Sequence, residues 1–231
     1  YAISISLVGS EMCIRDSLTA GLLGIGGGLI LVPALSWILI SRGVSIELAT
    51  TMAVATALAV IVFTALSSIR AHHMRGAVLW PVVVMMAPWI ALGALVGAIC
   101  GHLMGGRIIL LIFALFALLV ATRMLLRSNG GNLVQKTLFY PRIASISFGL
   151  LSALVGIGGG SMTVPYFRHH GYGMVNAIAN GAALGYPIAV ASAATYIAVG
   201  WEQDIPVSHW GYVYWPGLLA ITVTSVLTAP L

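Results

Sequence analysis

The chain has 231 residues, of which 60% are hydrophobic and 6% are charged. With a mean hydropathy of +1.07, it has too few polar side chains to cover a soluble domain, so the sequence predicts an integral membrane protein. The formal net charge of +5 is spread over short segments between apolar runs, which excludes a nucleic-acid partner. Cys13 and Cys100 are the only cysteines, which excludes a disulfide framework and a paired-cysteine metal site.

Residues 1–17 do not match the rest of the chain. They place Glu11, Arg15 and Asp16 just ahead of the first long apolar run. Arg15 follows the short apolar run 3–8, the reverse of the order in a signal peptide. We expect this segment to be a non-native scar or an unstructured leader, and we exclude it from the fold.

Seven apolar segments approach the length of about 20 residues that a bilayer core about 30 Å thick requires of a helix. They predict an all-α polytopic membrane protein. Two of the segments carry glycine clusters and are predicted to be broken or re-entrant, because such interruptions in corresponding positions are typical of transporter sites. In chain order the segments are 18–40, 47–69, 78–100, 107–126, 143–167, 177–199 and 212–231, of which the first and the fifth are glycine-rich.

The chain contains an internal repeat. The motif GIGGGLILVP at 24–33 returns as GIGGGSMTVP at 156–165, and each copy is followed by a segment rich in Ala, Thr, Ser and Gly. The triplet at 79–81, Leu-Trp-Pro, is also echoed by Tyr-Trp-Pro at 214–216. These matches predict two homologous transmembrane repeats at 18–126 and 143–231, joined by a polar linker at 127–142.

The second repeat is expected to be incomplete, because residues 97–126 have no counterpart in it. The missing part would be the rest of one helix and an eighth helix, so that a full repeat holds about four transmembrane helices. An even number of crossings per repeat predicts parallel halves. If every segment spans, the side richer in basic residues is predicted to be cytoplasmic. That side holds Arg70, Arg75, Arg123, Arg127, Lys136 and Arg142, and the other holds Arg42, Arg107 and Arg168.

The two glycine clusters, named here the first knot (24–28) and the second knot (156–160), are candidates for an anion site. Consecutive glycines turn successive backbone N–H groups toward one point, and a helix that starts after them adds its positive dipole end. Two facing knots therefore predict an uncharged site for a small anion. The alternative is that the glycines only permit close helix packing. The candidate substrate-binding backbones are those of Gly24, Gly26, Gly27, Gly28, Gly156, Gly158, Gly159 and Gly160.

Three polar side chains near the second knot are further candidates to contact the substrate. The hydroxyls of Ser161 and Thr163 either donate to a ligand or bond back to their own helix, which is the commoner case. The amide of Asn180 cannot bond to its own helix, so we expect it to contact a ligand or another helix. Its counterpart in the first half is Met52.

Pro33 and Pro165 follow the two knots at the same spacing. Each removes a backbone donor, which predicts a hinge or a kink at matching depth. The histidine pairs at 72–73 and 169–170 have no carboxylate or cysteine at ligand spacing, so no metal site is predicted and an interfacial role is expected. Proton coupling by one histidine is the alternative.

The knots and the segments that follow them resemble the sulfite exporter TauE/SafE family of membrane permeases, over residues 18–231. This resemblance implies a multi-pass permease of the inner membrane for sulfite, sulfonates or related organic anions, driven by an ion gradient. A proton or sodium is the candidate coupling ion, no cofactor is implied, and the oligomeric state stays open. Members commonly carry a Gly-Thr-Ser type element after the second knot, where this chain has Asn-Gly-Ala-Ala at 180–183, so Asn180 is expected to replace those hydroxyls.

The predicted function is therefore that of a secondary transporter, which moves a small sulfur-containing or carboxylate anion by alternating access. A passive anion channel, or a scaffold whose glycines merely pack helices, is the alternative. We do not expect an enzyme, because the apolar segments hold no paired carboxylates or catalytic triad. The acids of the chain are Glu11, Asp16, Glu47, Glu202 and Asp204.

Overall fold

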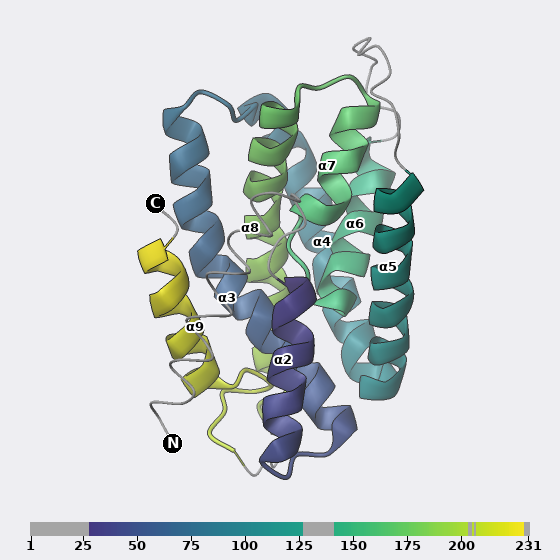
Figure 1. Cartoon of the computed structure of the whole chain (residues 1–231), viewed down its shortest axis with the longest axis vertical. Helices are drawn as coiled ribbons and strands as arrows, with labels where there is room; N and C mark the ends of the chain where they lie inside the picture. The colour runs from purple at the N-terminus through teal and green to yellow at the C-terminus, as the bar shows by residue number, and fades with distance from the viewer. Residues whose placement is uncertain (1–27, 127–140, 203–204, 206, 229–231) are drawn as a thin grey trace.

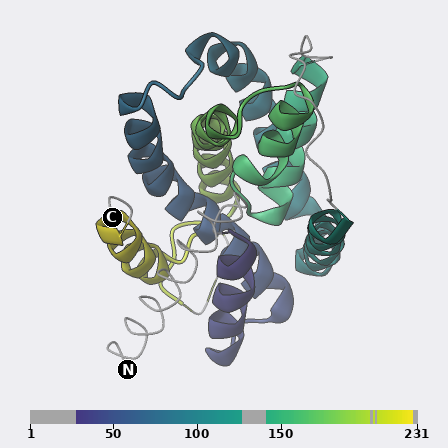
Figure 2. The same ribbon diagram turned by 45° about the horizontal axis from the view of Figure 1, so that its top comes forward.

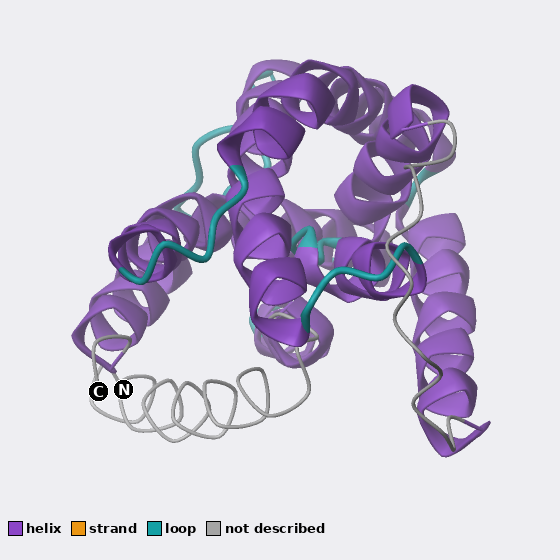
Figure 3. Cartoon of the chain, turned by 90° about the horizontal axis from the view of Figure 1, so that it is seen from above, coloured by secondary structure: helices purple, strands orange, loops and turns teal. Residues whose placement is uncertain are grey.

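The structure, a computed structural model, describes residues 28–126, 141–202, 205 and 207–228. In these residues it shows helices and loops, with one isolated bridge between Trp210 and Val213 (Figure 3). The expected leader 1–17, most of the linker, and Gly24, Gly26 and Gly27 of the first knot lie outside the described residues. The helices are α2 (Gly28–Ser41), α3 (Ile46–Met74), α4 (Trp80–Met104), α5 (Gly106–Leu126), α6 (Pro141–Val155), α7 (Gly160–His169), α8 (Met174–Val199) and α9 (Trp215–Thr228).

Three of the described helices, α3, α4 and α8, are long and apolar enough to cross a membrane. The helices α3 and α8 pack against each other and α8 also contacts α4 and α7, so α8 lies near the centre of the bundle (Figure 2). The outer surface is apolar, as a lipid-facing surface must be. On α5, for example, Leu111 and Leu115 are each 68% exposed.

The helices run between two ends of the molecule, which we name from Figure 1. The upper end is where α3 finishes and α4, α6 and α8 begin, and the lower end is where α2 finishes and α3, α5 and α9 begin. The helix α7 begins and α6 finishes near the middle of the molecule, where the first described residue of α2, Gly28, also lies. The elements that flank the second knot therefore enter and leave by the same end.

The fifth apolar segment is not one span, since it is divided into α6 and α7 at the second knot. Gly156 ends α6 with a φ of +73°, a left-handed conformation that favours glycine. The N–H groups of Gly156 and Ile157 donate to the Ser152 carbonyl at 3.0 and 3.2 Å, which satisfies the end of the helix. The Ser152 hydroxyl donates in turn to the Ile157 carbonyl. The knot is thus a hydrogen-bonded reversal of the chain.

This reversal overturns the prediction of parallel halves. The helices that the sequence pairs run in opposite directions: α2 runs downward and α7 upward, α3 upward and α8 downward, α4 downward and α9 upward (Figure 1). The physical reason is that a segment which turns back at mid-depth does not count as a crossing. In the second half, where the reversal is described, the number of segments that run from end to end is therefore one fewer than the number of apolar segments.

The distribution of charge changes for the same reason. Arg168 lies in the last turn of α7, so it belongs to the upper end and not to the lower end as predicted. Among the described residues, the upper end holds Arg70, Arg75, Arg123, Arg142 and Arg168, and the lower end holds Arg42 and Arg107. The upper end therefore remains the more basic of the two.

Glycines set the contact between α4 and α6. A Cβ on Gly149 of α6 would lie against the Ile90 carbonyl and 2.8 Å from the Ala94 nitrogen of α4. A Cβ on Gly93 of α4 would likewise lie against the Ile146 carbonyl of α6. Helices in membranes associate through close backbone approach of this kind. Lipid removes the hydrophobic driving force between helices, and small residues allow the van der Waals contacts that hold them together instead.

The variant Gly149→Val should be less stable than the parent by about 1–3 kcal/mol, because the added methyl groups meet backbone that cannot move aside. Thermal unfolding of the purified protein in detergent would measure the loss. Ser147→Val, on the exposed face of the same helix, is the matched control and should change stability by less than about 0.5 kcal/mol. Equal losses from both variants would contradict the packing role of Gly149.

Two glycines of the second knot should differ in their tolerance of alanine. At Gly156 a Cβ would lie 2.9 Å from Val32 Cγ2, on a backbone with φ +73°, whereas at Gly158 the nearest heavy atom, on Ile61, is 3.7 Å away. Gly156→Ala should cost about 1–2 kcal/mol from the left-handed backbone alone. Gly158→Ala should leave the unfolding temperature nearly unchanged, and a large loss at Gly158 would refute this description of the turn.

Candidate functional site

The start of α7 provides backbone donors at mid-depth. Gly159 is the N-cap of this 10-residue helix and makes no side-chain cap hydrogen bond. The first N–H groups of an α-helix have no partner within the helix, and they form the positive end of the helix dipole. These groups begin at Gly160, directly after the reversal at Gly156.

The start of α2 meets the second knot from the other half of the chain. Gly28 is buried, and a Cβ there would lie against the Gly156 carbonyl and 2.9 Å from Ile157 Cα. The helices α2 and α7 leave this point toward opposite ends (Figure 1), so the N-terminus of α7 and the first described residue of α2 both lie at the middle of the molecule. The structure therefore brings Gly28 of the first knot to the second knot.

Two glycines of α8 lie against the second knot. A Cβ on Gly159 would be 2.9 Å from the Gly185 nitrogen and 3.1 Å from the Gly181 carbonyl. A Cβ on Gly181 would be 2.9 Å from Thr163 Oγ1. Gly159 and Gly181 therefore have a packing role. A larger residue at Gly159 would disturb α8 as well as the knot, whereas Gly158 has room for a methyl group.

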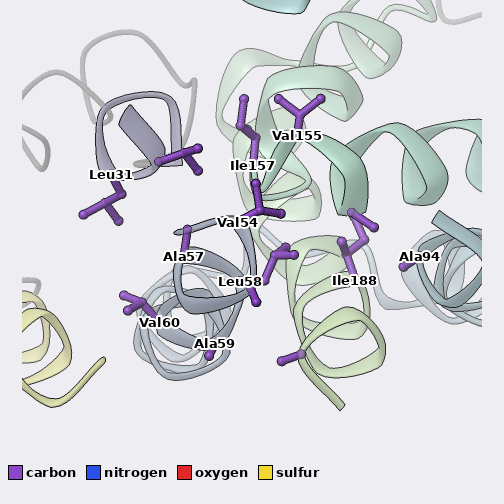
Figure 4. Close-up of a cluster of buried hydrophobic side chains, with 14 of the residues drawn as sticks. Leu31, Val54, Ala57, Leu58, Ala59, Val60, Ala94, Val155, Ile157 and Ile188 are labelled. Carbon is purple, nitrogen blue, oxygen red and sulfur yellow. The ribbon is translucent and has the colours of Figure 1, made fainter. Parts of the chain in front are cut away.

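Apolar side chains surround the junction. Figure 4 shows Val54 and Leu58 of α3 together with Val155, Ile157 of the knot and Ile188 of α8. All five are buried. Such an environment has a low dielectric constant, so partial charges on backbone N–H groups act more strongly there than in water.

The hydroxyls that the sequence singled out mostly bond to their own helix. Thr163 Oγ1 donates to the Gly159 carbonyl at 2.6 Å, and Ser161 Oγ has only a long contact of 3.4 Å with the Gly158 carbonyl. The Ser161 hydroxyl is therefore freer than that of Thr163 to donate elsewhere. Thr50, Thr51, Thr56 and Thr195 also donate to carbonyls of their own helices.

Asn180 makes the interhelical bond that was one of its two predicted roles. Its Oδ1 accepts a hydrogen bond of 2.8 Å from the Leu79 N–H at the start of α4. The side chain is fully buried, and its Nδ2 has no partner in the described part of the chain. The amide oxygen of Asn180 therefore binds the start of α4, while the amide nitrogen can still donate hydrogen bonds.

Pro33 and Pro165 each lie inside a helix, α2 and α7 respectively, and not at a break. Each helix continues past its proline to a well-formed end. The interruption between α6 and α7 comes from the knot glycines. A hinge function for the prolines stays a prediction.

The histidine pairs make local contacts. His73 Nδ1 accepts from Trp80 Nε1 at 3.1 Å, and His170 Nδ1 lies 2.8 Å from the Tyr166 carbonyl. Within the described residues, no three His, Cys, Asp or Glu side chains come together as metal ligands. Every charged residue of the described helices lies within two turns of a helix end, so the middle of the bundle is uncharged there.

Three tyrosines before or near α9 have partners that sequence reasoning missed. The Tyr212 hydroxyl lies 3.0 Å from His102 Nδ1 of α4, and the Tyr196 hydroxyl donates to the Ala153 carbonyl at 3.3 Å. The Tyr214 phenol accepts from Arg42 Nη1 at 2.6 Å. These contacts join residues far apart in the chain, and only the repeated aromatic-Trp-Pro triplet at 214–216 marked the region.

Comparison with known proteins places the chain among membrane transporters. The sequence profile described as Sulfite exporter TauE/SafE matches residues 17–231. A "Probable membrane transporter protein" of Haemophilus influenzae is 35% identical over 218 residues, which are 92% of this chain and 81% of that protein. The "Probable membrane transporter protein YunE" of Bacillus subtilis is 27% identical over 164 residues, which are 62% of this chain and 60% of the relative.

A "Probable membrane transporter protein" of Xylella fastidiosa is 30% identical over 151 residues, or 63% of this chain and 56% of the relative. No solved structure gives a significant match. The family profile covers nearly the whole chain, and the relatives carry the names of membrane transporters. The chain belongs to the sulfite exporter TauE/SafE family of membrane transporters.

Proposed function

We propose that the protein is a secondary transporter that moves a small anion by alternating access, and that it holds the anion between the N-termini of α2 and α7. One observation carries the proposal: α7 begins at the middle of the molecule, where it meets Gly28, the first described residue of α2, and the two helices run from there in opposite directions (Figure 1). The close approach of Gly28 to Gly156 supports it.

The chemistry of the proposed site comes from the backbone. The N-terminus of a helix carries a partial positive charge of roughly half a unit, and its free N–H groups donate to anions. Broken helices of other transporters direct such ends at anionic substrate groups. An anion held without a buried Arg or Lys leaves the site easily, which suits transport. The Ser161 hydroxyl is the best placed of the predicted side chains to add a donor, because Thr163 already donates to Gly159.

The substrate class that we propose is sulfite, a sulfonate or a related organosulfur or carboxylate anion. The description of the family supports the sulfur-containing anion, and the backbone donors suit any small oxyanion. We further propose an inner-membrane location, with the more basic upper end in the cytoplasm. A proton or sodium gradient would drive the transport.

The proposed carrier and a passive pore differ in their kinetics. In vesicles that contain the full-length protein, a carrier should move sulfite at a rate that saturates with concentration and depends on an imposed ion gradient. A rate that rises linearly with concentration would instead indicate a channel. No flux above that of empty vesicles, with sulfite, thiosulfate, sulfoacetate and taurine all tested, would favour a packing scaffold.

A matched pair of variants at Ser161 tests the backbone site. Ser161 lies in the first turn of α7, where proline is tolerated but removes an N–H group. Ser161→Pro should weaken sulfite binding at least tenfold, because a hydrogen bond to a charged group is worth about 1.5–3 kcal/mol. Ser161→Ala keeps the N–H group and should weaken binding only a few-fold. Isothermal titration calorimetry on the full-length protein would give both affinities.

The thermal unfolding temperature without ligand is the control for both variants. If Ser161→Pro unfolds at the parent temperature and still binds sulfite with parental affinity, the backbone donors of α7 do not hold the anion. If Ser161→Ala loses as much affinity as Ser161→Pro, the hydroxyl and not the backbone is the main donor.

A further inference from the structure

Two hydrogen bonds tie the start of a helix in one half of the chain to a helix of the other half. The Leu79 N–H, just before α4, donates to Asn180 Oδ1 of α8 at 2.8 Å. The Tyr214 N–H, just before α9, donates to Thr56 Oγ1 of α3 at 2.9 Å. Leu79 and Tyr214 hold corresponding positions, because each precedes a Trp-Pro pair. Each half therefore anchors the corresponding helix of the other half.

The two acceptors occupy equivalent places although their residue types differ. Asn180 corresponds to Met52 in the repeat, and Thr56 lies one helical turn after Met52. The Thr56 hydroxyl donates back to the Met52 carbonyl at 2.6 Å. Because side chains on a helix lean toward its N-terminus, this hydroxyl lies over the turn that contains Met52. The arrangement thus reproduces with a threonine what the other half does with an asparagine.

The two bonds lie at opposite ends of the molecule, since α4 begins at the upper end and α9 at the lower end (Figure 1). The connecting segment beside each bond is buried. Ala77 and Val78 are 4% and 8% exposed, and Tyr212 and Val213 are 5% and 1% exposed. Each hydrogen bond therefore holds an apolar segment over one end of the bundle.

The two bonds are not equally reinforced. The Thr56 hydroxyl both donates and accepts, so no donor hydrogen is left without a partner. Beside it, Arg42 donates to the Tyr214 phenol at 2.6 Å and lies 5.6 Å from the centre of its ring. Asn180, in contrast, leaves Nδ2 buried without a partner in the described residues. The upper bond is held by fewer interactions than the lower one.

We propose that the Leu79–Asn180 bond is the upper gate of the transport cycle and that the Tyr214–Thr56 bond is the lower gate. The gates rest on the proposed function, because they require that the two ends open alternately. Opening of one end breaks its own bond while the other bond stays intact. Asn180 and Thr56 are positioning residues in this scheme, and the upper gate, with fewer supporting contacts, opens more readily.

The experiment uses cysteine reporters beside each gate. In a background of Cys13→Ser and Cys100→Ala, the upper reporter is Ala77→Cys and the lower reporter is Val213→Cys, both at buried positions. The full-length protein is placed in lipid nanodiscs, where a membrane-impermeant maleimide reaches both ends. The rate of labelling at each reporter measures how often that end opens, and it requires no anion.

Each gate is then removed in turn by an apolar substitution of similar shape. Asn180→Leu should speed labelling of Ala77→Cys at least tenfold and leave Val213→Cys unchanged. Thr56→Val should do the reverse. The control variants keep a neutral acceptor oxygen: Asn180→Gln, which retains the amide, and Thr56→Ser should both label at close to the parent rates.

The outcomes separate the gates from general loosening. If Asn180→Leu speeds both reporters equally, or if neither reporter responds to either substitution, the two bonds are not gates. If Asn180→Leu fails to fold, Asn180→Ala takes its place as the variant that removes the upper acceptor, and the Thr56 pair still tests the lower gate and its end-specific effect. The readout is independent of sulfite binding, so the gates can fail while the anion site stands, and the reverse.

Discussion

The structure depends on one constraint, which is that backbone released from a helix inside a membrane must be enclosed by other protein. The second knot satisfies it at close range. Gly28 packs on the Gly156 carbonyl from one side, and Gly181 and Gly185 of α8 pack on Gly159 from the other. The absence of side chains at these positions allows three separate pieces of backbone to meet. The central place of α8 and the convergence of α2 on the knot both follow from this need.

The reversal at the knot also decides how the halves are oriented. Because α6 and α7 enter and leave by the same end, the paired helices of the two halves run in opposite directions. In the proposed function, this brings the positive end of α7 and the described start of α2 to the same point, where an anion is attracted. In parallel halves, α2 and α7 would run in the same direction, so they could not approach one site from opposite ends of the molecule.

Much of the fold could be predicted from the sequence, because the length of each apolar run predicts the length of the corresponding helix. The expected segments 78–100, 107–126 and 177–199 appear as α4 (Trp80–Met104), α5 (Gly106–Leu126) and α8 (Met174–Val199). Segment 143–167 is long enough to cross a membrane or to turn back, and hydropathy alone does not distinguish the two. The partner of Asn180 could not be predicted either, because Leu79 lies 101 residues away and contributes only its backbone. For Thr163, a candidate to contact the substrate, local rules gave a bond to its own helix as the commoner alternative, but they could not predict that Thr56 also accepts the Tyr214 N–H.

The difference between Asn180 and its counterpart Met52 has an energetic consequence. Two identical inverted halves would give the two end-open conformations the same free energy, and the empty protein would occupy them equally. Unequal bonds at the two ends remove this degeneracy, and a difference of about 1.4 kcal/mol is enough to populate one conformation tenfold over the other. In the proposed transport cycle, the empty protein would then favour one open end, and a single amide side chain would make the apparent affinity for the anion differ between the two sides, while the gradients set the direction of net movement.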